Sequence, residues 1–88
     1  QCAIALYIDS ENHIDTAKTL VTKKLYMSAT LEYLQALTRL SLAEIKAKDA
    51  KLNNYEEYKR IVNYNLEDKI KVRYKYCSSQ VERLKWMR

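Results

Sequence analysis

Apolar residues recur at intervals of three and four along most of the chain, which predicts long amphipathic helices. The first run comprises Ile14, Ala17, Leu20, Val21, Leu25, Met27, Leu31, Leu34, Leu37, Leu40, Ile45 and Leu52. Residues with high helix propensity separate these positions. The apolar pattern is widest between Leu31 and Ile45, so we expect that stretch to be the most deeply buried.

A turn is predicted at Asn53 and Asn54. Either asparagine could accept hydrogen bonds from the first amides of a following helix, whose positive end Glu56 and Glu57 would complement. A second run at helical spacing follows, comprising Tyr55, Tyr58, Val62, Leu66, Ile70, Tyr74, Cys77, Val81 and Leu84. The favoured interpretation is a single small all-α domain covering residues 1–88, folded as a helical hairpin or three-helix bundle.

A competing α+β interpretation comes from residues 69–76, where basic and apolar residues alternate strictly. Alternation with β-branched and aromatic residues is typical of a strand. Residues 61–66 would pair with it across Glu67 and Asp68, and residues 2–8 would form a third strand. The helical interpretation is favoured because two-residue hairpin turns prefer glycine or asparagine, which this pair lacks.

The composition excludes several kinds of functional site. The chain has no glycine and no proline, so it contains neither a glycine-rich phosphate loop nor a G-x-S-x-G nucleophile elbow. One histidine and two distant cysteines do not form a zinc cluster. The longest apolar run, residues 2–8, is too short to span a membrane. We therefore expect no cofactor, metal site or membrane span.

Positive charge is concentrated in the last third of the chain. The 16 basic and 11 acidic residues give a net charge of +5, and residues 61–88 contain seven basic but only three acidic residues. The candidate contacts for nucleic acid or an acidic partner are Lys69, Lys71, Arg73, Lys75, Tyr74, Tyr76 and Trp86. Cations of this kind neutralise phosphates, and aromatic rings stack on unpaired bases. On a helix, Lys69 and Arg73 would share one face, and Lys71 and Lys75 another.

Cys2 and Cys77 are candidates for a disulfide. In the α+β layout they could lie on neighbouring strands, whereas in a plain helical hairpin Cys77 would face Thr30, far from Cys2. An oxidised helical protein would then be linked between chains, and two free thiols are the alternative. The chain begins at Gln1, which fits a processed form, an internal fragment or the ordered part of a longer chain.

One short segment carries a resemblance to an enzyme family. An apolar stretch, Ile4–Ile8, is followed by Asp9 and Asn12 in the pattern D-x-x-N. This resembles the first strand and loop of the NYN and PIN-like nucleases, and the resemblance implies an α/β nuclease in which Asp9 helps to bind magnesium. We favour the alternative that Asp9, Ser10 and Asn12 cap a helix, and we expect no catalytic residues.

A second resemblance involves the segments Leu25–Ala29 and Tyr33–Leu37 together with Tyr55 and Tyr58. They are similar to the long periplasmic helices of outer-membrane efflux channels. The resemblance implies only a long helix that packs on others.

The tyrosine content favours an interaction role. Eight tyrosines and no phenylalanine supply amphipathic contact surface, and self-association would help to stabilise so small a core. We therefore predict a non-enzymatic protein–protein interaction or assembly module, with a homo-oligomer or another protein as its partner. The alternative is a nucleic-acid-binding module that uses residues 69–88.

Overall fold

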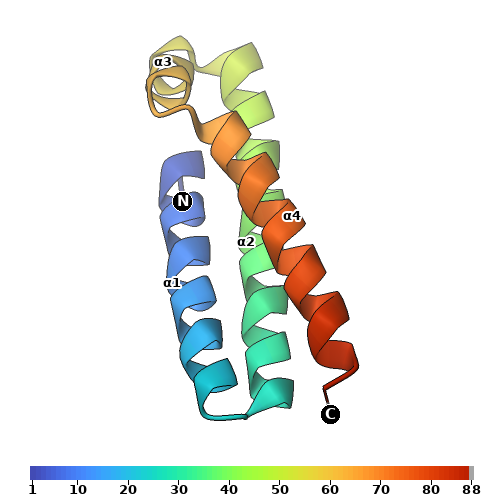
Figure 1. The fold of residues 1–88 in the computed structure, drawn as a ribbon. Coiled ribbons are helices and arrows are strands. Elements are labelled where there is room, and N and C mark those ends of the chain that lie inside the picture. Colours follow the sequence, from blue (N-terminus) through green and yellow to red (C-terminus); the bar gives the residue numbers. More distant parts are fainter. Residues whose placement is uncertain (88) are drawn as a thin grey trace.

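The fold consists of helices packed on either side of one long central helix. The computed structural model describes residues 1–87 and places four helices, and no strands, within them. The helices are α1 (Ala3–Thr22), α2 (Tyr26–Asn53), α3 (Tyr55–Asn63) and α4 (Leu66–Lys85). Helices α1 and α4 both run antiparallel to α2, and the short α3 joins α2 to α4 at one end of the molecule (Figure 1).

The all-α prediction is confirmed, and the strands proposed near residues 2–8, 61–66 and 69–76 are wrong. Residues 2–8 belong to α1 and its N-cap. Residues 61–66 comprise the end of α3, the turn after it and the first residue of α4, and residues 69–76 lie within α4. The alternation in residues 69–76 is compatible with a helix because only part of it faces inwards. Ile70 joins Cys77, beyond the segment, on the buried side of α4, whereas Val72 and Tyr74 are exposed.

The turn predicted at Asn53 and Asn54 is confirmed. Helix α2 ends at Asn53, and the Asn54 side chain accepts a hydrogen bond of 3.1 Å from the amide of Glu57. Glu56 and Glu57 occupy the first turn of α3, where carboxylates complement the helix dipole. Local sequence alone therefore specifies this boundary.

Two further breaks between helices, at residues 23–25 and 64–65, were not predicted. Each contains a residue other than glycine in the left-handed region, namely Lys24 with φ 63° and Asn65 with φ 57°. At the first break the amides of Lys24 and Leu25 donate to the carbonyls of Val21 and Leu20, each at 2.9 Å. This pair of bonds defines a Schellman motif, in which glycine normally occupies the position of Lys24.

The contact between α1 and α2 is lined by small side chains. Apart from Thr30, the buried positions of α2 follow alternating steps of four and three residues and comprise Ala29, Tyr33, Ala36, Leu40, Ala43, Ala47 and Ala50. Those of α1 are Ala3, Leu6, Tyr7, Ser10, Ile14 and Ala17. Alanine accounts for seven of the 17 buried hydrophobic residues within residues 1–87, so much of the core is built from small side chains. We call this contact the alanine seam.

The expectation that the stretch from Leu31 to Ile45 is the most buried is wrong for most of its large side chains. Leu40 is fully buried, but Leu31, Leu34 and Ile45 are exposed. The helix turns its alanines inwards, towards α1 and α4, and these larger residues to the opposite side. The spacing of three and four is shared by both faces, so the pattern identified the helix but not its inner face.

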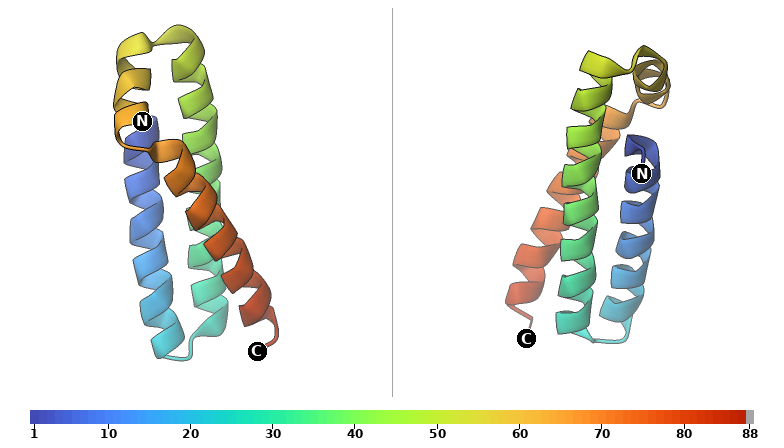
Figure 2. Two further views of the ribbon diagram at one scale, coloured as in Figure 1. Left: turned by 45° about the horizontal axis from the view of Figure 1, so that its top comes forward. Right: turned by 180° about the vertical axis from the view of Figure 1, so that it is seen from behind.

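Helix α4 covers another side of α2. Its buried residues, Leu66, Ile70, Cys77 and Leu84, form one stripe. Near the middle of this contact the rings of Tyr33 and Tyr76 meet edge to face, with centroids 6.1 Å apart. Helix α4 diverges from α1 towards its C-terminal end (Figure 2). The molecule is elongated and measures 45 × 17 × 16 Å.

Candidate interaction surfaces

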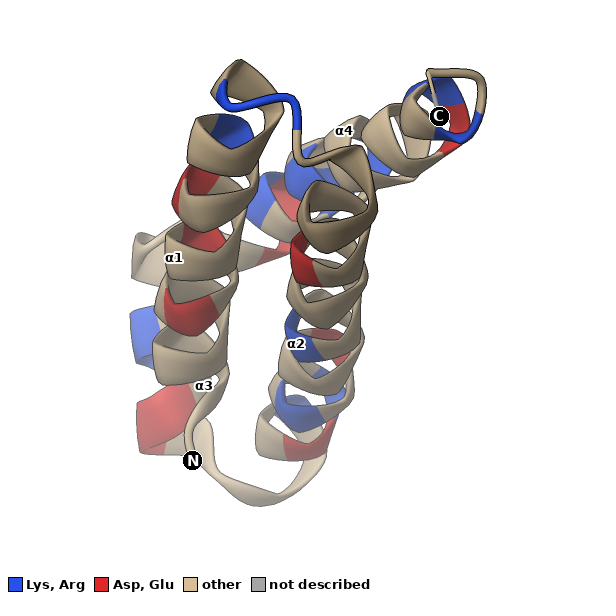
Figure 3. Ribbon diagram, turned by 90° about the horizontal axis from the view of Figure 1, so that it is seen from below, with Lys and Arg blue, Asp and Glu red and all other residues tan. Residues whose placement is uncertain are grey.

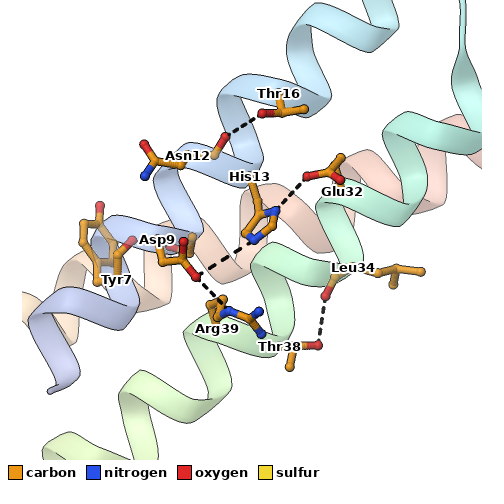
Figure 4. Close-up of polar contacts among 10 residues, drawn as sticks. Tyr7, Asp9, Asn12, His13, Thr16, Glu32, Leu34, Thr38 and Arg39 are labelled. Atoms are coloured by element: carbon orange, nitrogen blue, oxygen red, sulfur yellow. Dashed lines mark hydrogen bonds and ion pairs between the residues drawn. The ribbon is translucent and has the colours of Figure 1, made fainter. Parts of the chain in front are cut away.

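A group of charged side chains connects α1 to α2 along one edge of the alanine seam. Arg39 Nε donates to Asp9 Oδ2 at 2.8 Å, and His13 Nδ1 lies 2.7 Å from Glu32 Oε1. The other imidazole nitrogen is 4.0 Å from Asp9 (Figure 4). Because each carboxylate already has a partner on the neighbouring helix, the group holds α1 against α2.

The D-x-x-N segment lies within α1 rather than at the end of a strand, which corrects the expectation drawn from the nuclease resemblance. Asp9 is engaged by Arg39, and the carbonyl of Asn12 accepts a bond from the Thr16 hydroxyl. The capping interpretation is also wrong, because Asp9, Ser10 and Asn12 are interior residues of a helix that begins at Ala3. Within residues 1–87, no group of three His, Cys, Asp or Glu side chains is arranged to hold a metal.

Three of the seven candidate contact residues for nucleic acid or an acidic partner are already engaged inside the bundle. Arg73 makes two bonds to the Glu11 carboxylate, at 2.7 and 3.2 Å. The Tyr76 ring packs on Tyr33, and its hydroxyl lies 3.5 Å from the Tyr33 hydroxyl. Lys69 lies over the Tyr64 ring, 5.0 Å from its centroid.

The other four candidates, Lys71, Tyr74, Lys75 and Trp86, are exposed. Lys69 and Arg73 lie on the half-buried side of α4, while Lys71 and Lys75 lie on its solvent side. This is the division that helical spacing predicted. The structure therefore does not bring the seven residues together on one face, and nucleic-acid binding stays a prediction.

The two cysteines are free thiols in different environments. Cys2 is exposed, and its Sγ accepts a hydrogen bond from the Ala5 amide at the start of α1. Cys77 is fully buried in α4, and this burial raises the pKa of its thiol to about 11. The chain reverses at residues 23–25 as well as after α2, so the fold is not the plain hairpin that was expected (Figure 1). The contact of Tyr76 with Tyr33 nevertheless places Cys77 at the level of Thr30, as the hairpin geometry predicted. A disulfide through Cys77 requires α4 to detach first.

The most extensive unpartnered apolar surface lies on α2, opposite the alanine seam. Its residues are spaced alternately by four and three, as are the seam residues. We call this surface the outer face of α2; it comprises Met27, Leu31, Leu34, Thr38, Ser41, Ile45, Lys48 and Leu52. The five large apolar side chains among them are between 43% and 82% exposed. The outer face extends for about 38 Å at the helical rise of 1.5 Å per residue.

A shallow hollow adjoins the outer face where α4 passes α2. Ser41, Glu44 and Ile45 of α2 line it together with Tyr74 of α4. Tyr74, one of the candidate contact residues for nucleic acid or an acidic partner, is exposed and borders this hollow. Its ring extends the apolar surface beyond α2. The surface therefore offers both a helical ridge and an adjoining recess.

The outer face was not predicted because the helical spacing of its leucines is also that of a core stripe. The regular seven-residue spacing of Ala29, Ala36, Ala43 and Ala50 was an available signal for the true inner face. Within residues 1–87, no helix combines the length and the apolar character needed to cross a membrane. Comparison of the chain with protein-family models, curated proteins and solved structures gives no match.

Proposed function

We propose that this protein is a non-enzymatic assembly module whose copies associate through the outer face of α2. The observation that carries the proposal is the exposure of large apolar residues at heptad spacing along a helix whose opposite face is lined with alanine. Heptad spacing of apolar residues is the pattern by which two helices pack side by side.

The size of the core supports association. A chain of 88 residues buries a limited fraction of its surface, and alanine adds little apolar area when it is buried. Each large aliphatic side chain of the outer face would contribute about 1.5–3 kcal/mol if a partner covered it completely. Contiguous apolar surface on this scale marks interaction sites.

The outer face is nearly symmetric about its centre, which favours a second copy as the partner. Residues related by this symmetry would face each other when two α2 helices pair in antiparallel orientation about a two-fold axis. The facing pairs are Met27 with Leu52, Leu31 with Lys48, Leu34 with Ile45, and Thr38 with Ser41. Apolar residues therefore meet apolar residues on either side of a small polar centre.

The single mismatch, Leu31 opposite Lys48, is tolerable at a surface. Lys48 pairs with Glu44 of its own helix at 3.3 Å, and it is 75% exposed. A lysine of this kind can lay its aliphatic stem along an apolar neighbour while its ammonium group stays in water. The central Thr38 and Ser41 have short polar side chains that would leave the two helices free to approach.

We expect Ile45→Glu to weaken association by at least about a hundredfold, because the change places a carboxylate in an apolar contact without a partner. Sedimentation equilibrium of the whole chain measures this effect directly. Ile8→Glu is the matched control, because Ile8 is also an exposed isoleucine but lies on α1. A monomeric wild-type protein, or equal effects of the two substitutions, would reject the proposal.

The antiparallel orientation has its own test in a Cys2→Ser background. Met27→Cys and Leu52→Cys should form a disulfide between chains when the two variants are mixed under mild oxidation, because these positions face each other across the pair. Neither variant should cross-link efficiently alone. Non-reducing electrophoresis gives the result, and efficient cross-linking of either variant with itself would indicate parallel pairing.

A further inference from the structure

A large share of the net charge of the protein lies at one end of the bundle. This end, which we call the basic tip, consists of the α1–α2 connection at residues 22–25 and the last residues of α4, 82–87. Within it, Lys23, Lys24, Arg83 and Lys85 outnumber a single acidic residue, Glu82. The other described residues carry eleven basic and ten acidic side chains, so their charges nearly cancel.

The two parts of the basic tip are far apart in sequence but lie at the same end of the fold. The α1–α2 connection and the end of α4 flank the beginning of α2 (Figure 1). In the view onto this end, the connection is coloured for lysine and the last turns of α4 carry further basic positions (Figure 3). Glu82 is paired with Lys85 at 3.3 Å, and none of the ion pairs found within residues 1–87 involves Lys23, Lys24 or Arg83.

Exposed apolar side chains accompany these cations. Trp86 is 80% exposed, Leu25 50% and Met87 41%, although Leu84 beside them is completely buried. Leu25 is held in place by the Schellman motif, through its amide bond to the Leu20 carbonyl. These three side chains belong neither to the core nor to the outer face of α2.

We propose that the basic tip binds the surface of an anionic lipid bilayer. Lysine and arginine are attracted to the negative potential of such a surface, and partly inserted apolar side chains add hydrophobic binding. Tryptophan is favoured at the level of the lipid headgroups because its ring is amphipathic. A nucleic acid would use the cations and the indole ring, but it would leave Leu25 and Met87 without a role. The lipid surface therefore accounts for more of the tip.

Trp86 provides the measurement because it is the only tryptophan of the chain. Vesicles of phosphatidylcholine mixed with phosphatidylserine should shift its fluorescence to shorter wavelength, since the indole leaves water. Pure phosphatidylcholine vesicles should give no comparable shift. Added salt should weaken the binding because it screens the charges of both surfaces. Absence of the shift with the anionic vesicles would overturn the proposal.

A matched pair of double variants separates the basic tip from the basic segment of α4. Lys23→Gln/Lys24→Gln should weaken vesicle binding about 30-fold, from about fivefold for each lysine near the lipid surface. Lys71→Gln/Lys75→Gln removes the same charge from the middle of α4 and should leave binding nearly unchanged. Equal losses in the two double variants would contradict binding through the tip.

Two further measurements distinguish lipid binding from nucleic-acid binding and from self-association. A single-stranded oligonucleotide that binds more tightly than the anionic vesicles would overturn the lipid assignment in favour of nucleic acid. The Ile45→Glu variant should bind the vesicles as the wild-type chain does, since Ile45 lies outside the tip. Loss of binding in that variant would contradict a site confined to the tip, so failure of self-association and failure of lipid binding are distinguishable.

Discussion

Leu40→Ala is expected to lower the free energy of unfolding by about 3 kcal/mol. Leu40 is fully buried in the middle of α2, one turn from Ala36 and one turn from Ala43. Its removal leaves a cavity in a seam whose neighbouring side chains are too small to close it. The loss therefore combines the lost burial of the leucine with the cost of the empty space.

Leu42→Ala is the matched control for this substitution. Leu42 lies two positions away on the same helix, but it is 40% exposed. Its replacement should cost less than about 1 kcal/mol, because a partly solvated side chain has less burial to lose. Urea denaturation of both variants gives the comparison, provided that the dependence on denaturant is unchanged. Equal losses would show that Leu40 does not contribute to the core as described.

Stability is expected to fall steeply in alkaline solution, beginning near pH 9. The buried Cys77 thiol has a pKa of about 11, against an ordinary value of 9.0, because burial disfavours the thiolate. Below pH 9 the thiol is protonated in both the folded and the unfolded chain, so its contribution is complete there. Between pH 9 and 11 only the unfolded chain loses the proton, and Cys77 alone costs about 2–3 kcal/mol of stability.

Two tyrosines act in the same direction as Cys77. Burial, followed by a hydrogen bond with Tyr76, raises the pKa of Tyr33, and burial followed by hydrogen bonding with Glu11 raises that of Tyr7. The folded chain therefore retains phenolic protons that the unfolded chain loses above pH 10. Their contribution extends the loss of stability to higher pH.

Chemical denaturation between pH 8 and 11, under reducing conditions, tests the contribution of Cys77. Cys77→Ala should be less stable at pH 8 because it leaves a small cavity, yet its stability should decline less between pH 9 and 11. Cys2→Ser removes the exposed thiol and should keep the wild-type slope. The explanation would be wrong if Cys77→Ala showed the same alkaline decline as the wild-type chain.

Local sequence was sufficient for the parts of the fold that depend on neighbouring residues. The helical spacing, the asparagine cap at residue 54 and the glutamates after it correctly predicted the boundary between α2 and α3. The helix breaks at Lys24 and Asn65 were missed because their usual marker, a glycine, is absent. Asparagine enters the left-handed region more readily than most residues, so Asn65 was an available signal, whereas nothing in the side chain of Lys24 indicated this conformation.

The orientation of each helix could not be predicted in the same way. Both sides of α2 carry residues at heptad spacing, and only the position of α1 shows that Ala36 faces inwards and Leu34 outwards. The candidate contact residues on α4 also depended on packing that the local sequence does not show. Arg73 had the sequence context of a surface cation, but its partner Glu11 lies 62 positions away along the chain.

The unequal attachment of α1 and α4 to α2 sets an order for folding. Residues 23–25 alone connect α1 to α2, whereas contacts between α2 and α4, such as that of Tyr33 with Tyr76, join positions 43 residues apart. Closing a short loop loses less chain entropy, so we expect the α1–α2 hairpin to form first and α4 to dock last. The outer face of α2 belongs to that hairpin. Association of two copies therefore does not have to wait for the last step of folding.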